Sequence, residues 1–244
     1  MTWILLWKRL LPLDWKTIRR DSLLLWVPLF PFVLALFLRQ ALPALNGLLA
    51  TWQFSLAPYY SLFLCGLLLL VPQMSGLLVG FLLLDERDER TLQAIQMTPV
   101  PTSTYLLYKL SLPLMLGFVS TLLSLPLSGF VTLRWWQALL VVPICALLGP
   151  ITALFLVAFA DNKVTGLAVF KLMNGVLMLP LVAFFVAEPW QWLFGLLPPY
   201  WTMKAVWMMQ KGEAVHWVLL VGWLTHGLAA YGLYRLWSSR LERG

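Results

Sequence analysis

Long apolar runs alternate with short polar breaks along this chain, and the pattern predicts helices that cross a membrane. Six leucine-rich runs occupy residues 22–38, 56–84, 104–133, 137–160, 164–187 and 214–237. Each is close to or above the roughly 20 residues that an α-helix needs to span the hydrocarbon of a bilayer. Strands of a membrane barrel would instead alternate apolar and polar residues. We therefore expect an all-α polytopic membrane protein with six transmembrane helices, in which residues 1–244 form a single membrane domain.

Two segments outside these runs are still rich in apolar residues. Residues 1–21 combine three tryptophans with five cations, which is typical of an amphipathic helix lying on the cytoplasmic leaflet, with a split expected at Pro12. A basic tail that only sets the topology is the alternative. Residues 188–213 are too apolar for a free loop and too often broken by proline for a span. They predict short helices that re-enter the outer leaflet, where protein covers the broken backbone.

The sharpest polar break is a run of six charges, residues 85–90, between the second and third apolar runs. An ionised side chain at the bilayer centre costs about 2.5 to 3.5 kcal/mol, so this run must lie in water or against a partner. We interpret residues 85–103 as a docking segment. A loop that is merely soluble is the alternative.

Composition and charge agree with a membrane protein. Hydrophobic residues make up 61% of the chain and charged residues 11%, against about 25% charged residues in soluble domains. If the N-terminus is inside, 13 of the 17 lysines and arginines fall on the inner side, and the positive-inside rule then predicts that both termini are cytoplasmic. The net charge of +7 needs no nucleic acid to explain it, since anionic headgroups attract such loops.

The chemistry of a catalytic, cofactor or metal site is missing from the sequence. His216 and His226 are ten residues apart in one apolar run, so they lack the i, i+4 spacing of a metal-binding pair on a helix. Cys65 and Cys145 fall inside spans as packing residues. No GxxxxGK[ST] loop is present, so any ATP must be bound by a partner. Carboxylates lie only at or beyond the ends of the spans, which disfavours an ion-driven carrier.

A few polar residues inside spans are candidates for a substrate pathway. Gln73, Met74 and Ser75 lie in the second run, and Lys171 and Asn174 lie in the fifth, three residues apart and so on one helix face. Hydrogen bonding between helices is the alternative role for Gln73 and Ser75. For Lys171 the alternative is a side chain that reaches back to the headgroups.

Together these features resemble the permease subunit of ABC-2 type ABC transporters. The resemblance covers essentially the whole chain, and it is most specific at Glu89-Arg90-Thr91-Leu92, Thr98-Pro99-Val100 and Tyr108-Lys109. One departure is Arg90, where many members have glycine. Such permeases contact a cytosolic ATPase through this segment, which implies an ATPase-coupling role for Asp85, Glu86, Arg87, Asp88, Glu89, Arg90, Thr91 and Leu92.

The resemblance also implies the partners and the direction of transport. It implies two copies of an ABC ATPase subunit that bind ATP and Mg²⁺, and a second permease subunit, either identical or related. The expected function is export of a hydrophobic or amphipathic substrate, such as a drug-like molecule, an antibiotic or a lipid, across the bacterial cytoplasmic membrane. A membrane scaffold or sensor that anchors an ATPase without transport is the alternative.

Overall fold

The computed structural model describes residues 3–89, 102–130 and 133–241, and all regular secondary structure within them is helical. The N-terminal part contains α1 (Trp3–Arg20), α2 (Ser22–Trp26), α3 (Phe30–Ala50), η1 (Ala57–Tyr59) and α4 (Tyr60–Asp88). The middle contains α6 (Thr102–Ser128), α7 (Trp135–Ala146), α8 (Leu148–Phe159) and α9 (Lys163–Met178). The last part contains η2 (Leu179–Phe185), η3 (Trp190–Leu196), α10 (Pro198–Lys211) and α11 (His216–Leu241).

Five helical segments within the described residues are long and apolar enough to cross a membrane. They are Phe30–Ala50, Ala57–Asp88, Thr104–Ser128, Trp135–Phe159 and Lys163–Phe185. The all-α, multi-pass character predicted from the sequence is thus confirmed. Helix α11 has 26 residues but is not among the five, so the count of six spans stays a prediction.

The expected position of the first span, residues 22–38, was wrong. Residues 22–26 form the separate short helix α2, residues 27–29 form a turn, and the long helix α3 begins only at Phe30. Pro31 is the second residue of α3, where its missing N–H costs nothing because the first turn of a helix has no intrahelical acceptor. The apolar run therefore breaks around Pro28 and continues into the next 21 residues.

Proline also shapes the fourth and fifth runs, and it has less effect on α1 than expected. Pro150 has no N–H for the carbonyl of Ala146, the last residue of α7, and the run divides there into α7 and α8. Pro180 similarly ends α9 and starts η2. By contrast α1 is continuous through Pro12, so the expected split was wrong. The carbonyl freed by Pro12 belongs to Lys8, whose exposed position lets water hydrogen-bond it.

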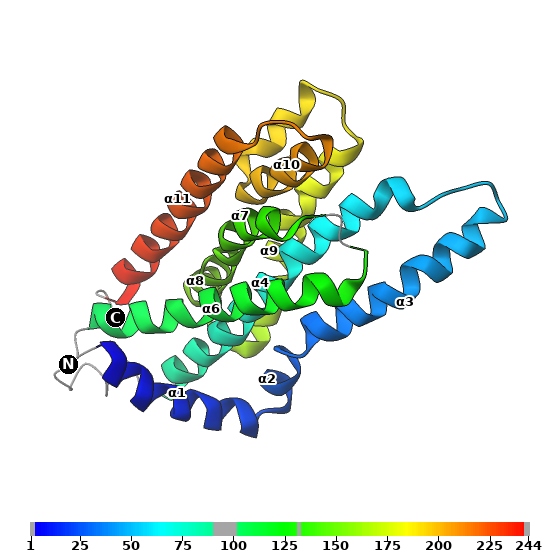
Figure 1. Cartoon of the computed structure of the whole chain (residues 1–244). Helices are drawn as coiled ribbons and strands as arrows, with labels where there is room; N and C mark the ends of the chain where they lie inside the picture. The colour runs from blue at the N-terminus through cyan, green and yellow to red at the C-terminus, as the bar shows by residue number, and fades with distance from the viewer. Residues whose placement is uncertain (1–2, 90–101, 131–132, 242–244) are drawn as a thin grey trace.

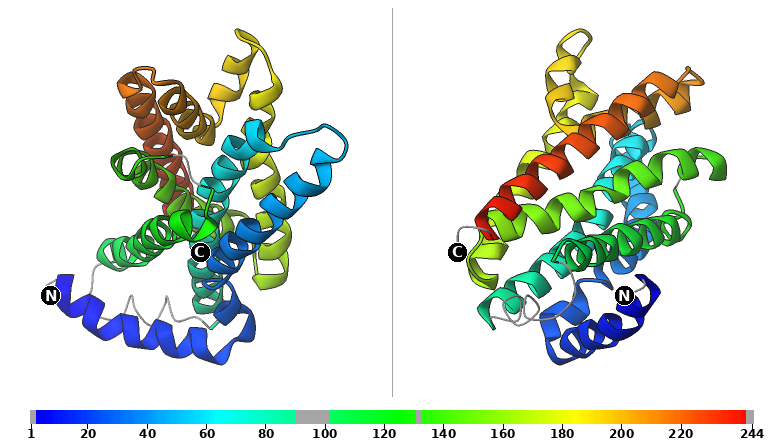
Figure 2. Two further views of the ribbon diagram at one scale, coloured as in Figure 1. Left: turned by 45° about the vertical axis from the view of Figure 1, so that its right-hand side comes forward. Right: turned by 90° about the vertical axis from the view of Figure 1, so that its left-hand side faces the viewer.

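Helix α4 is the centre of the bundle, and 94% of the residues in its apolar stretch are buried. It packs most extensively on α8 and α6, as Figures 1 and 2 show. A Cβ added to Gly76 would lie 2.3 Å from the carbonyl oxygen of Gly149, and one added to Gly80 would lie 2.6 Å from Leu156. Gly76 and Gly80, four residues apart, therefore allow the backbones of α4 and α8 to approach closely.

The two ends of the bundle differ in character. Helix α1 runs across one end, where α4 and α11 finish and α6 and α9 begin (Figure 1). We call this the α1 end. Helices η3 and α10 lie at the opposite end, which we call the α10 end. The two short helices expected within residues 188–213 are present there, and their depth in the membrane stays a prediction.

Helix α3 is the candidate span that other helices cover least, since only 11% of the residues in its apolar stretch are buried inside the protein. It packs chiefly along α6 and leaves much of its apolar surface exposed, including Val33, Leu36, Phe37 and Leu48. Figure 2 shows it at the edge of the bundle. Lipid or a second permease subunit would cover such a surface in a membrane.

Candidate functional site: a charged junction at the α1 end

Charged side chains from four helices and the α1–α2 link meet at the α1 end, within the part of the chain that the structure describes. The group, which we call the charged junction, consists of Asp14, Asp21, Asp85, Glu86, Arg87, Lys109 and Lys163. Asp85, Glu86 and Arg87 are the first charged residues after the apolar run of α4. The junction therefore lies just beyond the last buried residue of that helix, Leu84.

Lys109 is the buried centre of the first half of the junction. Its side chain is 1% exposed, and its Nζ lies 2.6 Å from Asp14 Oδ1 and 2.6 Å from Glu86 Oε1. The Tyr108 hydroxyl donates to Asp14 Oδ2 at 2.9 Å, and the Tyr105 hydroxyl donates to Glu86. One cation between two carboxylates leaves an excess negative charge, which the two hydroxyl donors stabilise. Helices α1, α4 and α6 are joined at this point.

Aromatic rings close this half of the junction. Lys109 Nζ lies 5.7 Å from the ring centroid of Tyr105 and 5.9 Å from that of Tyr108, within the range of cation–π attraction. The ring of Trp7 packs edge-on against Tyr108 with centroids 5.2 Å apart. Trp7, Asp14 and Ile18 are spaced by seven and four residues, so they share the face of α1 that turns to the bundle. The cations of α1 are exposed.

Lys163 is the centre of the second half. Its Nζ lies 2.6 Å from Asp21 Oδ2 and 2.8 Å from Asp85 Oδ2. Asp21 also caps α2, because its Oδ1 accepts from the N–H of Leu23 at 2.9 Å. The hydrogen bond from Lys163 holds the pKa of the Asp21 carboxyl below its usual range. Asn162 caps α9 and accepts from the N–H of Thr165, which fixes Lys163 at the first turn of that helix.

Arg87 links α4 to the end of α8. Its guanidinium donates to the carbonyl of Ala160 at 2.6 Å and lies 3.5 Å from that of Val157. These carbonyls belong to the last turn of α8 and the residue after it, where a helix has unpaired acceptors and favours a cation. The junction therefore connects the end of α4 to α1, α6, α8 and α9.

The structure divides the eight residues predicted to couple to an ATPase. Asp85, Glu86 and Arg87 are turned into the molecule and engaged in the junction. Asp88 and Glu89, at the end of α4, are exposed. Arg90, Thr91 and Leu92 lie outside the described residues. Contact with an ATPase stays a prediction, and the described residues best placed for it are the exposed pair.

The pathway candidates fall into two separate groups. Gln73 is fully buried and its Nε2 donates to the carbonyl of Leu69 at 3.0 Å. The Ser75 hydroxyl lies 2.6 Å from the carbonyl oxygen of Pro72 in α4 and 2.8 Å from that of Pro113 in α6. The Ser75 hydroxyl therefore forms a packing contact between α4 and α6.

The remaining candidates differ in exposure. Met74 and Asn174 are half-buried, and Lys171 is exposed on α9. No hydrogen bond or ion pair joins the α4 group to the α9 pair within residues 3–89 and 133–241. Their role in a pathway stays a prediction.

Sequence reasoning missed the inward partners of the charged segment. Asp14 and Asp21 were counted only as carboxylates outside the spans, Lys163 only for topology, and Lys109 for topology and as part of the family resemblance. In the structure Lys109, Lys163 and Asp21 belong to the ion pairs around Glu86 and Asp85, and Asp14 pairs with Lys109. Two signals were present. Asp14 and Asp21 are carboxylates seven residues apart in a basic amphipathic segment, and Lys109 interrupts an apolar run.

Comparison with known proteins identifies the family of this chain. Residues 14–234 match the family described as fluoroquinolones export permease protein Rv2686c-like. The chain belongs to this family. Two relatives from Mycobacterium tuberculosis are 31% identical over 214 residues, which is 86% of this chain and 84% of each relative. They are fluoroquinolones export permease protein MT2760 of strain CDC 1551 / Oshkosh and fluoroquinolones export permease protein Rv2686c of strain ATCC 25618 / H37Rv.

No solved structure matches the chain. The resemblance to ABC-2 type permeases is confirmed by the family and by the relatives, and the chain is a multi-pass membrane permease.

Proposed function

We propose that this chain is the membrane-spanning subunit of an ATP-driven exporter in the bacterial cytoplasmic membrane, with both termini in the cytoplasm. ATP and Mg²⁺ bind to a separate cytosolic ABC ATPase, present in two copies, and the permease itself binds no cofactor. The observation that carries the proposal is the charged junction, because it connects the charged end of α4 to four other helices.

The junction explains how motion of an ATPase would reach the spans. An ATPase that contacts Asp88, Glu89 and the residues after them moves the end of α4. The ion pairs of Lys109 and Lys163 then carry α1, α6 and α9 with it as one body. The buried charge-assisted hydrogen bonds of Lys109 contribute about 1.5 to 3 kcal/mol each, and the more exposed pairs of Lys163 contribute about 1 kcal/mol or less. Several such contacts acting together resist separation of these helices. Rocking of packed helices is a known form of transporter switching.

A second permease subunit completes the pathway in this proposal. The exposed apolar side of α3 and exposed residues of α9 such as Leu172 and Val176 are the faces it would cover. The relatives are named for the export of fluoroquinolones, and we propose that this chain exports an amphipathic, drug-like molecule of that kind.

A pull-down of the tagged chain from its native membrane in mild detergent, followed by mass spectrometry, tests this function. We expect a soluble P-loop ATPase in stoichiometric amount, and a second permease if the pair is a heterodimer. If no ATPase accompanies the chain while other membrane complexes stay intact, the exporter proposal fails and a scaffold or sensor takes its place.

A further inference from the structure

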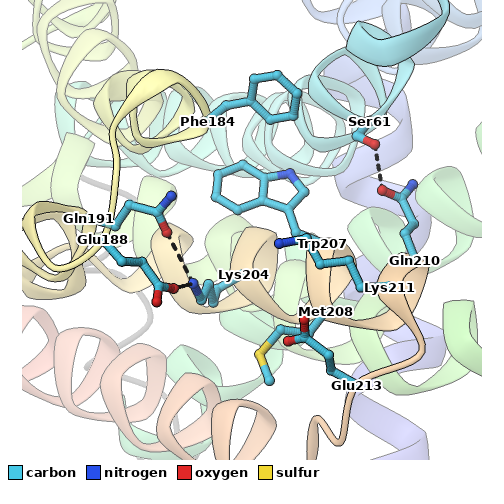
Figure 3. Close-up of a pocket in the computed structure, with 10 residues that line it drawn as sticks. All are labelled: Ser61, Phe184, Glu188, Gln191, Lys204, Trp207, Met208, Gln210, Lys211 and Glu213. Carbon is cyan, nitrogen blue, oxygen red and sulfur yellow. Dashed lines mark hydrogen bonds and ion pairs between the residues drawn. The ribbon is translucent and has the colours of Figure 1, made fainter.

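A cavity of about 520 Å³ opens at the α10 end, between α4, η2 and α10 (Figure 3). Its volume lies within the range of about 300 to 1,000 Å³ that is typical of sites for drug-sized ligands. A neighbouring cavity of about 740 Å³ shares Lys211 and Glu213 with it. Neither belongs to the charged junction, which lies at the opposite end of the bundle.

The cavity has an aromatic wall and a fixed ionic rim. The rings of Phe184 and Trp207 pack edge to face with centroids 5.7 Å apart. On one side Lys204 forms an ion pair with Glu188, and its Nζ lies 3.0 Å from Gln191 Oε1. The hydrogen bond from Lys204 holds the pKa of the exposed Glu188 carboxyl below its usual range. These contacts fix the beginning of η3 and the residues just before it against α10, so this side of the cavity is preformed.

A second pair of opposite charges stands at the end of α10. Lys211 is the last residue of the helix, and in Figure 3 its side chain extends toward Trp207 across the cavity. Gly212 follows with a φ of 75°, a left-handed conformation that glycine adopts at low cost. The N–H of Glu213 then bonds the carbonyl of Met208 at 2.9 Å, which is the closing bond of a Schellman cap.

This turn fixes both charges at the mouth of the cavity. Lys211 and Glu213 are exposed, and neither forms an ion pair with another residue in the described ranges. The Lys204–Glu188 pair is satisfied within the protein. Lys211 and Glu213 therefore offer one cation and one anion to a ligand that has the complementary two charges.

We propose that this cavity binds an aromatic zwitterion. The carboxylate of the ligand pairs with Lys211, its ammonium pairs with Glu213, and its ring system lies against Phe184 and Trp207. The inference rests on the proposed function, because an exporter with a cytoplasmic α1 end presents the α10 end outside. The cavity is then the last site that a substrate contacts before release.

Direct binding to the purified full-length permease in nanodiscs tests the inference. The probes are norfloxacin, a fluoroquinolone with a free carboxylate and a basic piperazine nitrogen, and its ethyl ester, which keeps the amine and lacks the carboxylate. We measure both affinities by equilibrium dialysis against empty nanodiscs. The variants are Lys211→Met, Lys211→Arg, Glu213→Gln and, as a control for loss of an exposed cation elsewhere, Lys16→Met.

We expect Lys211→Met to weaken binding of norfloxacin about fivefold, the factor that corresponds to the upper end of what an exposed ion pair contributes. Binding of the ester should be unchanged in that variant, because the ester has no carboxylate. Lys211→Arg should restore the affinity for norfloxacin. Glu213→Gln should weaken both ligands, and Lys16→Met should weaken neither.

The inference is overturned if Lys211→Met changes both ligands equally, or changes neither. It is also overturned if norfloxacin does not bind the permease above empty nanodiscs. Failure of the exporter proposal would look different, since it is seen as an absent ATPase in the pull-down, whereas binding to this cavity needs no ATPase.

Discussion

The ammonium of Lys109 lies 2.6 Å from the carboxylate of Asp14, across 95 residues of sequence, and both side chains are buried. The contact fastens the N-terminal helix α1 to the beginning of α6. Because Lys109 also holds Glu86 at 2.6 Å, α1, α4 and α6 share a single buried cation.

Removal of that cation should destabilise the protein strongly. Lys109→Met leaves Asp14 and Glu86 buried without their counter-ion, and breaking a buried pair in this way typically costs about 3 to 5 kcal/mol. We expect a marked drop in the thermal unfolding temperature of the purified permease. Lys16→Met, which removes an exposed cation of α1, is the control. Equal unfolding temperatures for both variants would mean that the Lys109 pairs do not hold the helices together.

Asp21→Asn distinguishes the contribution of the Asp21–Lys163 ion pair from that of the helix cap that Asp21 also provides. Asparagine caps a helix about as well as aspartate, so this variant loses mainly the bond to Lys163. Both side chains are about a third exposed, at 31% for Asp21 and 30% for Lys163, and we expect a loss of at most about 1 kcal/mol at pH 7. Asp21→Ala should lose about 1 kcal/mol more, because it also removes the cap.

The same pair predicts a pH dependence. The pKa of Asp21 is lower in the folded protein than its usual value of 3.8. The ionised carboxylate therefore contributes fully to the folding stability above that value, and this contribution is lost as the pH falls through the pKa of the folded state. The stability difference between the wild type and Asp21→Asn should therefore stay constant from pH 8 to pH 5. A difference that shrinks within this range would contradict the lowered pKa.

The close crossing of α4 and α8 predicts different responses from two glycines of one helix. In Gly76→Ala the new Cβ would lie 2.3 Å from the carbonyl oxygen of Gly149, a backbone atom, so the two helices must separate. In Gly66→Ala nothing lies within 4 Å, and alanine should be neutral or stabilise the helix by about 0.5 to 1 kcal/mol. Thermal unfolding of both variants is the measurement. The packing account fails if Gly76→Ala is as stable as Gly66→Ala.

Asn174 tests whether α9 contributes to the substrate pathway. Its side chain is half-buried beside the exposed Lys171. If it contacts substrate, Asn174→Leu should change which compounds are exported while the amount of assembled permease stays the same. Ser75→Ala, which removes a packing hydrogen bond to Pro113, should leave the substrate profile unchanged. An unchanged profile in Asn174→Leu would assign that residue to packing.

The sequence predicted those features that depend on local pattern. Continuous apolar runs are enough to recognise α4, α6 and α9, and the mixture of tryptophan and cations is enough to recognise α1. The start of α3 was misplaced because a proline such as Pro28 can either kink a span or end a helix, and neighbouring contacts choose between them. The partners of Glu86 and Asp85 could not be read from the sequence, because Lys109 and Lys163 approach them only when the helices pack.

The structure also changes how the docking segment, residues 85–103, is understood. Six consecutive charges suggested a uniform surface for a partner. The structure instead uses Asp85, Glu86 and Arg87 to hold the bundle together and leaves Asp88 and Glu89 exposed. A reversal of Glu86 would therefore disturb folding as well as docking.

Co-purification of the ATPase with charge-reversed permease tests the coupling account most directly. The test variant is Asp88→Lys combined with Glu89→Lys, and the control is Asp161→Lys, an exposed carboxylate in the turn before α9. The amount of inserted permease and its unfolding temperature are measured alongside. The account predicts that the double variant inserts and folds normally but loses most of its ATPase, whereas the control keeps it. An unchanged amount of ATPase with the double variant would contradict the account.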